Sequence, residues 1–294
     1  MRVTQGMLSN NLLRNLNNSA GKMDNYLTQL TTGKKINLPS DDPVIAMKGI
    51  GYRTELVKVE QYVRNTGEVH NWMDNSDAAL DKATAAMQRL RELAVQASNG
   101  TYDEEELASI NEEAKQLKEH LVDLANTNVN GKYIFNGTIT DTPPVMMDDD
   151  GNITEMFPEL KDRDVKIEVS GGTTLKANVD GNEAFNGVFD AVDKFILRLE
   201  GNGEPLDTSI AEIDTGINSI INSRAELGAR MNRLELVENR LKEQEVVATS
   251  IMSKNEDIDY AETITKFITQ ESLHRAALSA GSKIIQPSLI DFLR

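Results

Sequence analysis

From Leu80 to Leu124 the chain reads LDKATAAMQRLRELAVQASNGTYDEEELASINEEAKQLKEHLVDL. Apolar residues recur here every three or four positions on both sides of one polar break, as they do on the buried face of a helix. They are Leu80, Ala83, Met87, Leu90, Ala94 and Ala97 before the break, and Leu107, Ile110, Ala114, Leu117, Leu121 and Leu124 after it. Asn99-Gly100-Thr101 ends the first helix, and the acidic residues 103–106 suit the first turn of the second. The stretch therefore predicts an antiparallel helical hairpin. Its core positions carry no metal or cofactor ligands, so no cofactor is expected.

Helical spacing extends outward from this hairpin in both directions. Residues 44–96 form one long helical pattern, with a short apolar stripe over 185–199 and a long pattern over 209–258 farther along the chain. A helix over 209–258 would span roughly 75 Å at 1.5 Å per residue, which is more than a globular domain normally buries. The cluster of turn and cap residues at 37–43 predicts a loop, with Pro43 in the first turn of the next helix and Asp41 or Asp42 as its cap.

The middle of the chain changes character. Residues 130–137 place a short β-prone run between two Asn-Gly turn signals, and Val165, Ile167 and Val169 alternate with charged residues as in a half-buried strand. We therefore predict a mainly α protein, a long antiparallel helical bundle or coiled coil built from both chain ends, with a small β-rich insertion domain. The predicted divisions are terminal helices at 1–37 and 261–294, a long-helix bundle at 38–135 and 183–260, and the insertion at 136–182.

Composition fits this architecture and excludes several classes of function. Aromatic residues make up only 5% of the chain and charged residues 27%, a balance typical of long packed helices. The net charge of −16 argues against nucleic acid, which binds basic surfaces. No apolar run is long enough to span a membrane, so no membrane insertion is expected. The first thirty residues mix Asn, Ser, Arg and Gln among apolar residues, so no apolar secretory leader is expected either.

Chemistry-bearing motifs are weak. His70, His120 and His274 lie far apart in sequence, each in a helical and mostly polar context, where exposed histidines are ordinary. Asp148, Asp150, Asn152 and Thr154 follow the spacing of a calcium loop, but its sixth position is Ile153 rather than glycine, so an acidic hairpin turn is favoured. We expect no catalytic residue, no metal site and no enzyme activity.

The two ends of the chain carry apolar stripes without an obvious partner. Leu8, Leu12 and Leu16 belong to the first, and the opposite face of that segment is rich in asparagine, a poor helix former. Ile284, Leu289, Phe292 and Leu293 belong to the last. Because such helices are marginal alone, we predict that they bury their stripes against each other and against neighbouring subunits.

With these features in hand, the chain resembles the bacterial flagellin superfamily, and within it the hook-associated protein 3 branch. The matching runs cover nearly the whole chain outside about 138–183; they are residues 30–37 (LTTGKKIN), 40–43 (SDDP), 88–96 (QRLRELAVQ), 99–101 (NGT), 224–235 (RAELGARMNRLE), Ser250-Ile251, 257–262 and 288–293 (SLIDFL). The opening MRVT, the run 130–137 and the small middle domain resemble the hook–filament junction protein more than flagellin. Lys34-Lys35 departs from the Leu-Arg pair common at that place in the superfamily.

The resemblance implies an extracellular structural subunit of the flagellum that joins the hook, through the first hook-associated protein, to the flagellin filament. It implies export through the flagellar type III channel, a cytosolic export chaperone on the C-terminal helix, and self-association in a ring. Residues 1–37 and 261–294 would form an inner tube by folding as they assemble. Gln88, Arg89, Leu93 and Gln96 are the candidate lateral contact face, although an exposed helix with one core leucine would show the same pattern.

Three other functions stay open at this point. Flagellin itself is the nearest, because its two ends share the same motifs. An enzyme or a glycan-binding module carried in the insertion is the second, although some 45 residues leave little room for a pocket. A cytosolic coiled-coil scaffold is the third.

Overall fold

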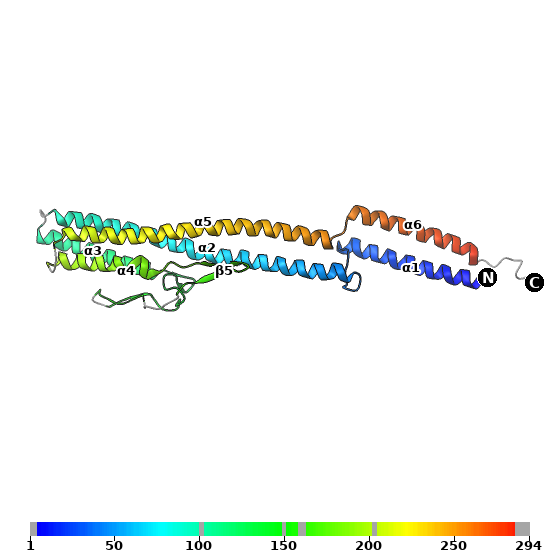
Figure 1. Ribbon diagram of the computed structural model, residues 1–294, viewed down its shortest axis with the longest axis horizontal. Coiled ribbons are helices and arrows are strands. Elements are labelled where there is room, and N and C mark those ends of the chain that lie inside the picture. The colour runs from blue at the N-terminus through cyan, green and yellow to red at the C-terminus, as the bar shows by residue number, and fades with distance from the viewer. Residues whose placement is uncertain (1–4, 100–102, 149–150, 158–162, 202–204, 286–294) are drawn as a thin grey trace, which may run out of the picture. The chain divides into compact units, whose positions relative to one another are not determined.

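The computed structural model describes residues 5–99, 103–148, 151–157, 163–201 and 205–285. Long helices dominate this part of the chain (Figure 1). They are α1 (Gln5–Thr32), α2 (Pro43–Ser98), α3 (Glu104–Ala125), α4 (Gly181–Leu199), α5 (Asp207–Glu256) and α6 (Tyr260–Ile285). The predicted fold class is confirmed: long helices come from both ends of the chain, and small antiparallel strand pairs lie between them. None of the described helices is long and apolar enough to cross a membrane.

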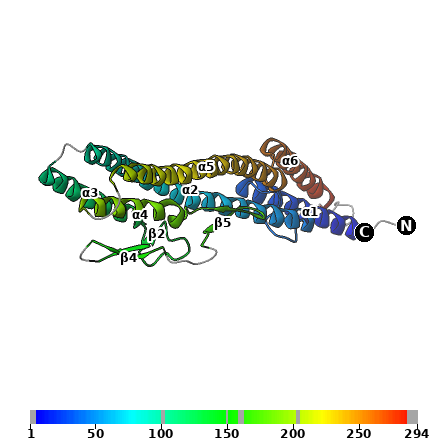
Figure 2. The same cartoon turned by 60° about the vertical axis from the view of Figure 1, so that its left-hand side comes forward.

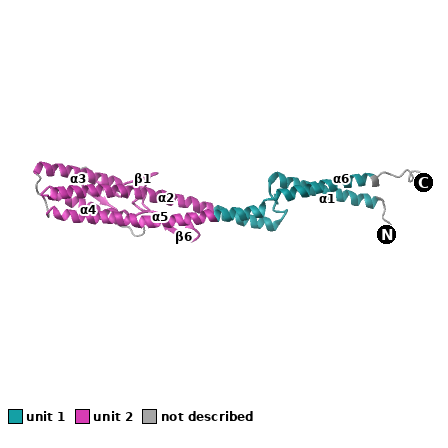
Figure 3. Cartoon of the chain, turned by 90° about the horizontal axis from the view of Figure 1, so that it is seen from above, with its two compact units in different colours: residues 1–58, 244–294 teal, residues 59–243 magenta. Residues whose placement is uncertain are grey.

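The chain divides into two compact units, coloured separately in Figure 3. Unit 1 consists of residues 1–58 and 244–294, and unit 2 of residues 59–243. The division expected from the sequence, into terminal helices, a long-helix bundle and an insertion, stays a prediction.

Unit 2 has its core where α2, α3, α4 and α5 meet. The predicted hairpin stripes lie in it: every stripe residue from Leu80 to Ala97 is buried, and Ile110, Ala114, Leu121 and Leu124 are buried from the α3 side. Arg89 of α2 bonds to Glu113 of α3 at 2.7 Å, and α3 also packs along α4. The Glu106 carboxylate accepts the Asp103 amide at 3.3 Å, which satisfies one of the free amides at the start of α3.

In the described part of the β-rich middle, the strands form three separate two-stranded antiparallel hairpins. Their strands are β1 (Asn128–Val129) with β2 (Lys132–Tyr133), β3 (Val145–Met147) with β4 (Ile153–Met156), and β5 (Lys166–Ser170) with β6 (Thr173–Lys176). Asn130 and Gly131 join the first pair with φ of 53° and 80°, the left-handed conformation that their Asn-Gly sequence predicts. Asp148 and Asn152 of the calcium-like motif close the β3–β4 turn, because the Asp148 carboxylate accepts the Asn152 amide at 2.7 Å.

The hairpins lie against the helices of unit 2 (Figure 2). Asn65 of α2 donates to the Glu168 carbonyl of β5 at 2.7 Å, and Lys118 of α3 donates to the Gly151 carbonyl at 2.7 Å. Phe135 and Phe157 from the middle pack on Phe185 of α4, with ring centroids 5.1 and 6.3 Å away. These contacts join the hairpins to the helices of unit 2.

Candidate assembly site in unit 1

Helices α1 and α6 of unit 1 pack along each other. Burial along both helices alternates in steps of three and four residues, the spacing of a coiled-coil seam. The seam positions are Ser9, Leu12, Leu16, Ser19, Met23, Tyr26 and Leu30 on α1, and Thr263, Phe267, Gln270, His274, Ala277 and Gly281 on α6. At one end of the pair Gly281 is buried against Leu12, and a Cβ at Gly281 would lie 2.5 Å from a Leu12 methyl group.

The seam is more polar than that of a stable coiled coil, while large apolar side chains remain outside it. Ser19 and Gln270 share a hydrogen bond of 2.8 Å between the two helices. The exposed apolar residues of the pair are Met7, Leu8, Leu13 and Leu27 on α1, and Tyr260, Ile264, Ile268, Leu273 and Leu278 on α6. Water-exposed apolar clusters of this extent mark interaction surfaces. The described part of the pair thus leaves large apolar side chains exposed on both helices.

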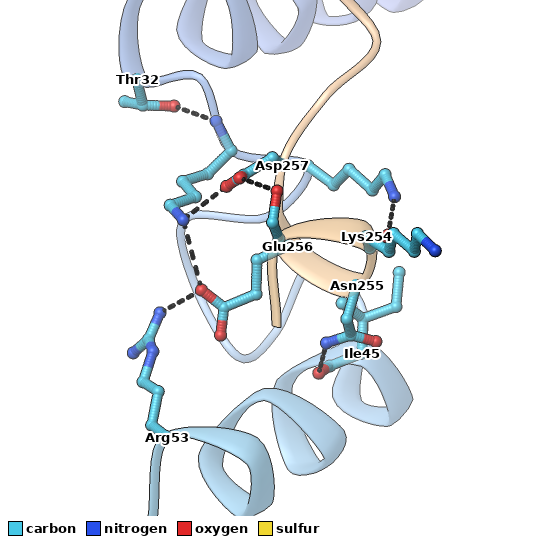
Figure 4. Close-up of polar contacts among 10 residues, drawn as sticks. Thr32, Ile45, Arg53, Lys254, Asn255, Glu256 and Asp257 are labelled. Carbon is cyan, nitrogen blue, oxygen red and sulfur yellow. Dashed lines mark hydrogen bonds and ion pairs between the residues drawn. The ribbon is translucent and has the colours of Figure 1, made fainter. Parts of the chain in front are cut away.

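A cluster of polar contacts ties the start of the chain to its end; we call it the connector (Figure 4). The Lys34 ammonium lies 2.6 Å from the Asp257 carboxylate and 3.5 Å from that of Glu256. Arg53 of α2 reaches the same Glu256 carboxylate at 2.6 Å. The backbone adds two bonds, from the Lys35 amide to the Glu256 carbonyl at 2.6 Å and from the Ile258 amide to the Gly33 carbonyl at 3.0 Å. The segments after α1 and after α5 are therefore held side by side.

Glycine allows the close approach that the connector needs. Gly49 of α2 is buried, and a Cβ there would lie 2.5 Å from the Glu256 Oε1 atom. Glu256 is only 4% exposed, which makes it a buried carboxylate held by two cations. Gly33 has φ of 73°, and its amide closes the last turn of α1 on the Gln29 carbonyl.

The charges of the connector stabilise one another. The hydrogen bond from Lys34 lowers the pKa of Asp257 below its ordinary value of 3.8, and the Ser253 hydroxyl adds to the effect. The same bond raises the pKa of Lys34 above 10.5. Both groups are therefore fully charged at neutral pH.

The loop between α1 and α2 is ordered by two neighbouring aspartates. The Asp42 carboxylate accepts the Val44 and Ile45 amides at 2.9 and 3.1 Å, so Asp42 is the cap of α2. Asp41 instead accepts the Leu38 and Asn37 amides, and these bonds lower its pKa. The sequence offered either aspartate as the cap, and the structure separates their roles.

The structure brings together only some of the predicted contact residues. Leu8 is exposed on α1, whereas Leu12 and Leu16 lie in the seam with α6. Ile284 lies in α6, but its side chain is outside the described part, and Leu289, Phe292 and Leu293 lie outside the described residues.

The second predicted group lies on α2 in unit 2. Gln88, Arg89 and Gln96 are exposed on one face, while Leu93 is 1% exposed and packs in the core. Leu93 therefore packs beneath the exposed face in this folded unit, and the lateral contact face formed by these residues stays a prediction. Leu93 follows Leu90 by three positions and precedes Ala97 by four, and this helical spacing could have predicted that Leu93 is buried.

The connector was missed by reasoning from the sequence alone. Lys34 was noted as a departure from the family's Leu-Arg pair and Asp257 as part of a motif, but no sequence pattern paired them across more than two hundred residues.

A hollow of about 500 Å³ in unit 2 is lined by charges that neutralise one another, Lys118 with Asp193 at 2.6 Å and Lys115 with Glu200 at 3.1 Å. Among the described residues no three His, Cys, Asp or Glu side chains are grouped to hold a metal ion.

Comparison with known proteins gives a consistent result at both ends of the chain. Residues 3–140 match the bacterial flagellin N-terminal helical region, and residues 210–293 match the bacterial flagellin C-terminal helical region. Flagellar hook-associated protein 3 of Escherichia coli is 27% identical over 304 residues, covering 95% of this chain and 96% of the relative. Flagellin of Bacillus subtilis is 28% identical over 291 residues, covering 94% of each.

A solved structure agrees in both fold and sequence. The crystal structure of Bacillus cereus FlgL is 27% identical, with a TM-score of 0.59, and the match covers 69% of this chain and 99% of that one. The family match spans the helices that build the terminal pair, the connector and the hairpin. This chain belongs to the bacterial flagellin family.

Proposed function

We propose that this protein is a structural subunit of the bacterial flagellum, outside the cell, that joins the hook to the flagellin filament. The similarity to hook-associated protein 3 and to FlgL supports this role, and the matched family consists of structural flagellar proteins. The role requires no catalysis.

One observation carries the proposal: the terminal pair is folded but incompletely buried. Leu273 of α6 is 57% exposed and Leu27 of α1 is 53% exposed, although the two helices pack along each other. A polar seam holds α1 and α6 together only weakly, so much of the free energy available to the pair lies in contacts with other subunits. Assembly of the termini and burial of their apolar residues are then one coupled step.

The proposed partners follow from the position of such a subunit. The first hook-associated protein would bind on the hook side, flagellin on the filament side, and further copies of this chain in a ring. A cytosolic export chaperone would cover the C-terminal helix before export through the flagellar type III channel. Covering α6 in the cytosol would prevent the premature contacts that its exposed isoleucines invite.

Flagellin itself is the second candidate, because this chain is 28% identical to Bacillus subtilis flagellin and 27% identical to the hook-associated protein 3 of Escherichia coli. A strain lacking the gene distinguishes the two. If the chain is the junction subunit, electron microscopy shows bare hooks and flagellin accumulates in the medium. Loss of filaments without flagellin in the medium would identify the chain as the filament subunit, and intact filaments would exclude both functions.

A further inference from the structure

Asparagine followed by glycine is a chemically reactive pair, and the sequence contains five of them, at 99–100, 130–131, 136–137, 186–187 and 202–203. Asparagine is one of the less durable residues of a protein. Glycine makes it more reactive, because glycine has no side chain to keep its own backbone nitrogen away from the asparagine amide. The pairs at 130–131, 136–137 and 186–187 lie in the described part of the chain. Their surroundings differ, so they should not react alike.

Asn130 and Gly131 form the turn of the β1–β2 hairpin and are open to water. Both residues are exposed, and both have positive φ. Apart from the chain neighbours of Gly131, no atom lies within 4 Å of the place that a Cβ of Gly131 would take. Among the described residues, no group holds the Asn130 side chain in a hydrogen bond. The Asn130 amide can therefore rotate toward the Gly131 nitrogen, and water can reach both.

The pair Asn136-Gly137 is held in place and shielded from water. Asn136 is fully buried, and its Nδ2 atom donates to the Thr142 carbonyl at 3.0 Å. Gly137 is buried as well, and a Cβ there would clash with the Arg163 carbonyl oxygen. The side-chain amide and the following nitrogen can therefore approach each other only if this part of unit 2 opens.

The pair at 186–187 is protected in a different way, by the helix that contains it. It lies inside α4, away from both ends of that helix. Within an α-helix each backbone amide donates to the carbonyl four residues earlier. The nitrogen of Gly187 can therefore attack a side chain only after the helix has opened locally. Of the three pairs, only the one in the hairpin turn can react without prior unfolding.

We propose that Asn130 is a site of spontaneous deamidation in the folded protein. The Gly131 nitrogen forms a bond to Cγ of Asn130, the bond from Cγ to Nδ2 breaks, and the amide group leaves as ammonia with the proton of the Gly131 amide. Water from the solvent then opens the cyclic imide at one of its two carbonyl carbons. One opening gives aspartate, and the other gives isoaspartate, in which the main chain runs through the former side chain. This chemistry does not depend on the proposed function.

The two products should affect the hairpin differently. Asn130 lines a hollow of about 40 Å³ together with Glu68 of α2 and Lys132. A carboxylate at position 130 is repelled by Glu68 but attracted by Lys132, so the aspartate form should stay close to the native structure. Isoaspartate adds one carbon atom to the main chain of a turn whose flanking residues, Val129 and Lys132, are paired. Because the longer turn no longer fits this pairing, the isoaspartate form should have a loosened hairpin.

Peptide mass spectrometry of the full-length protein, sampled during incubation in mildly alkaline buffer, tests the site. Asn130 should convert at least about tenfold faster than the pairs at 136–137 and 186–187, because these must first open locally. In denaturant the three pairs should convert at similar rates, since only the fold distinguishes them. Asn130→Gly, which keeps the positive φ of the turn, is the matched control and should remove the product at this site alone. Equal rates at the three pairs of the folded protein, or a slower rate at Asn130, would overturn the proposal.

Hydrogen exchange tests the structural consequence. The Ile134 amide donates to the Thr127 carbonyl at 3.2 Å, directly beyond the paired strands, and so reports on opening of the hairpin. In the isoaspartate fraction, separated from the aged protein by anion exchange, this amide should exchange at least about fivefold faster than in the native chain. Asn130→Asp carries the charge without the longer main chain and should exchange like the native protein. Equal exchange in the isoaspartate fraction, or faster exchange in Asn130→Asp, would refute the effect of the longer turn.

Discussion

The connector predicts a specific local weakening when the Glu256 carboxylate becomes an amide. Glu256→Gln keeps the volume of the side chain but loses its charge, and with it the charge-assisted bond to Arg53 at 2.6 Å and the ion pair with Lys34 at 3.5 Å. A hydrogen bond to a charged group contributes about 1 kcal/mol more than a neutral one. The two cations remain partly exposed and are rehydrated, so the larger cost of a stranded buried charge does not apply.

The expected loss is therefore about 1 kcal/mol, confined to the connector. The Lys35 and Ile258 amides report on it, because each donates to the opposite chain segment. A local opening that is easier by 1 kcal/mol accelerates their hydrogen exchange about fivefold, while amides in the core of unit 2 keep their rates. Glu55→Gln is the matched control, since Glu55 is an exposed carboxylate of α2 that makes no ion pair within the described structure.

The result that would refute this reasoning is unchanged exchange at both amides in Glu256→Gln. Equal acceleration by Glu55→Gln would also refute it, because the effect would then come from net charge alone and not from the buried pair.

Three further predictions concern other parts of the chain. Because the pKa of Asp257 is lowered in the folded state, the stability that Asp257 contributes is present above pH 3.8 and is lost as pH falls through its folded-state pKa. The pKa of Lys34 is raised, so the stability that Lys34 contributes is present below pH 10.5 and is lost as pH rises through its folded-state pKa. Thermal unfolding and hydrogen exchange of the connector amides, measured across pH, should show both limits. Gly181→Ala should destabilise unit 2 by about 1–3 kcal/mol in denaturant titrations, because the new Cβ would clash with the buried ring of Phe157. Gly187→Ala, with open space in the same helix, should be neutral or stabilising by up to about 1 kcal/mol, and equal losses in both variants would contradict the packing argument. Deleting residues 285–294 should leave a soluble, folded monomer that cannot support filament growth, and filaments on such cells in electron micrographs would disprove the role of the terminal helices.

Local patterns in the sequence were sufficient for the helices and their ends. The repeat from Leu80 to Leu124 predicted two packed helices, and its residues form the core of unit 2 because a helix brings every third or fourth side chain to the same face. The loop at 37–43, with Pro43 in the first helical turn, predicted where α2 begins. Each of these signals acts over a few residues, so no tertiary information was needed.

The candidate site was only partly predictable. The apolar stripes at the chain ends indicated helices that need partners, but they did not show which residues would lie in the seam. Leu12 and Leu16 face α6 while Leu8 faces water, because the rotation of α1 is set by the helix against which it packs. In the same way Leu93 is buried although Gln88 and Gln96 beside it are exposed.

The sequence by itself thus determined the helical class, the hairpin, the Asn-Gly turn and the family, because periodicity and turn chemistry are properties of neighbouring residues. Only the tertiary structure decided the connector and which face of α2 its own chain covers. Lys34 and Asp257 are 223 positions apart, and their ion pair exists because α1 and α6 lie side by side. Gly49 of α2 is buried against Glu256 of α5, which shows the covered face. A helix with two apolar faces cannot show from its sequence which one its own chain covers.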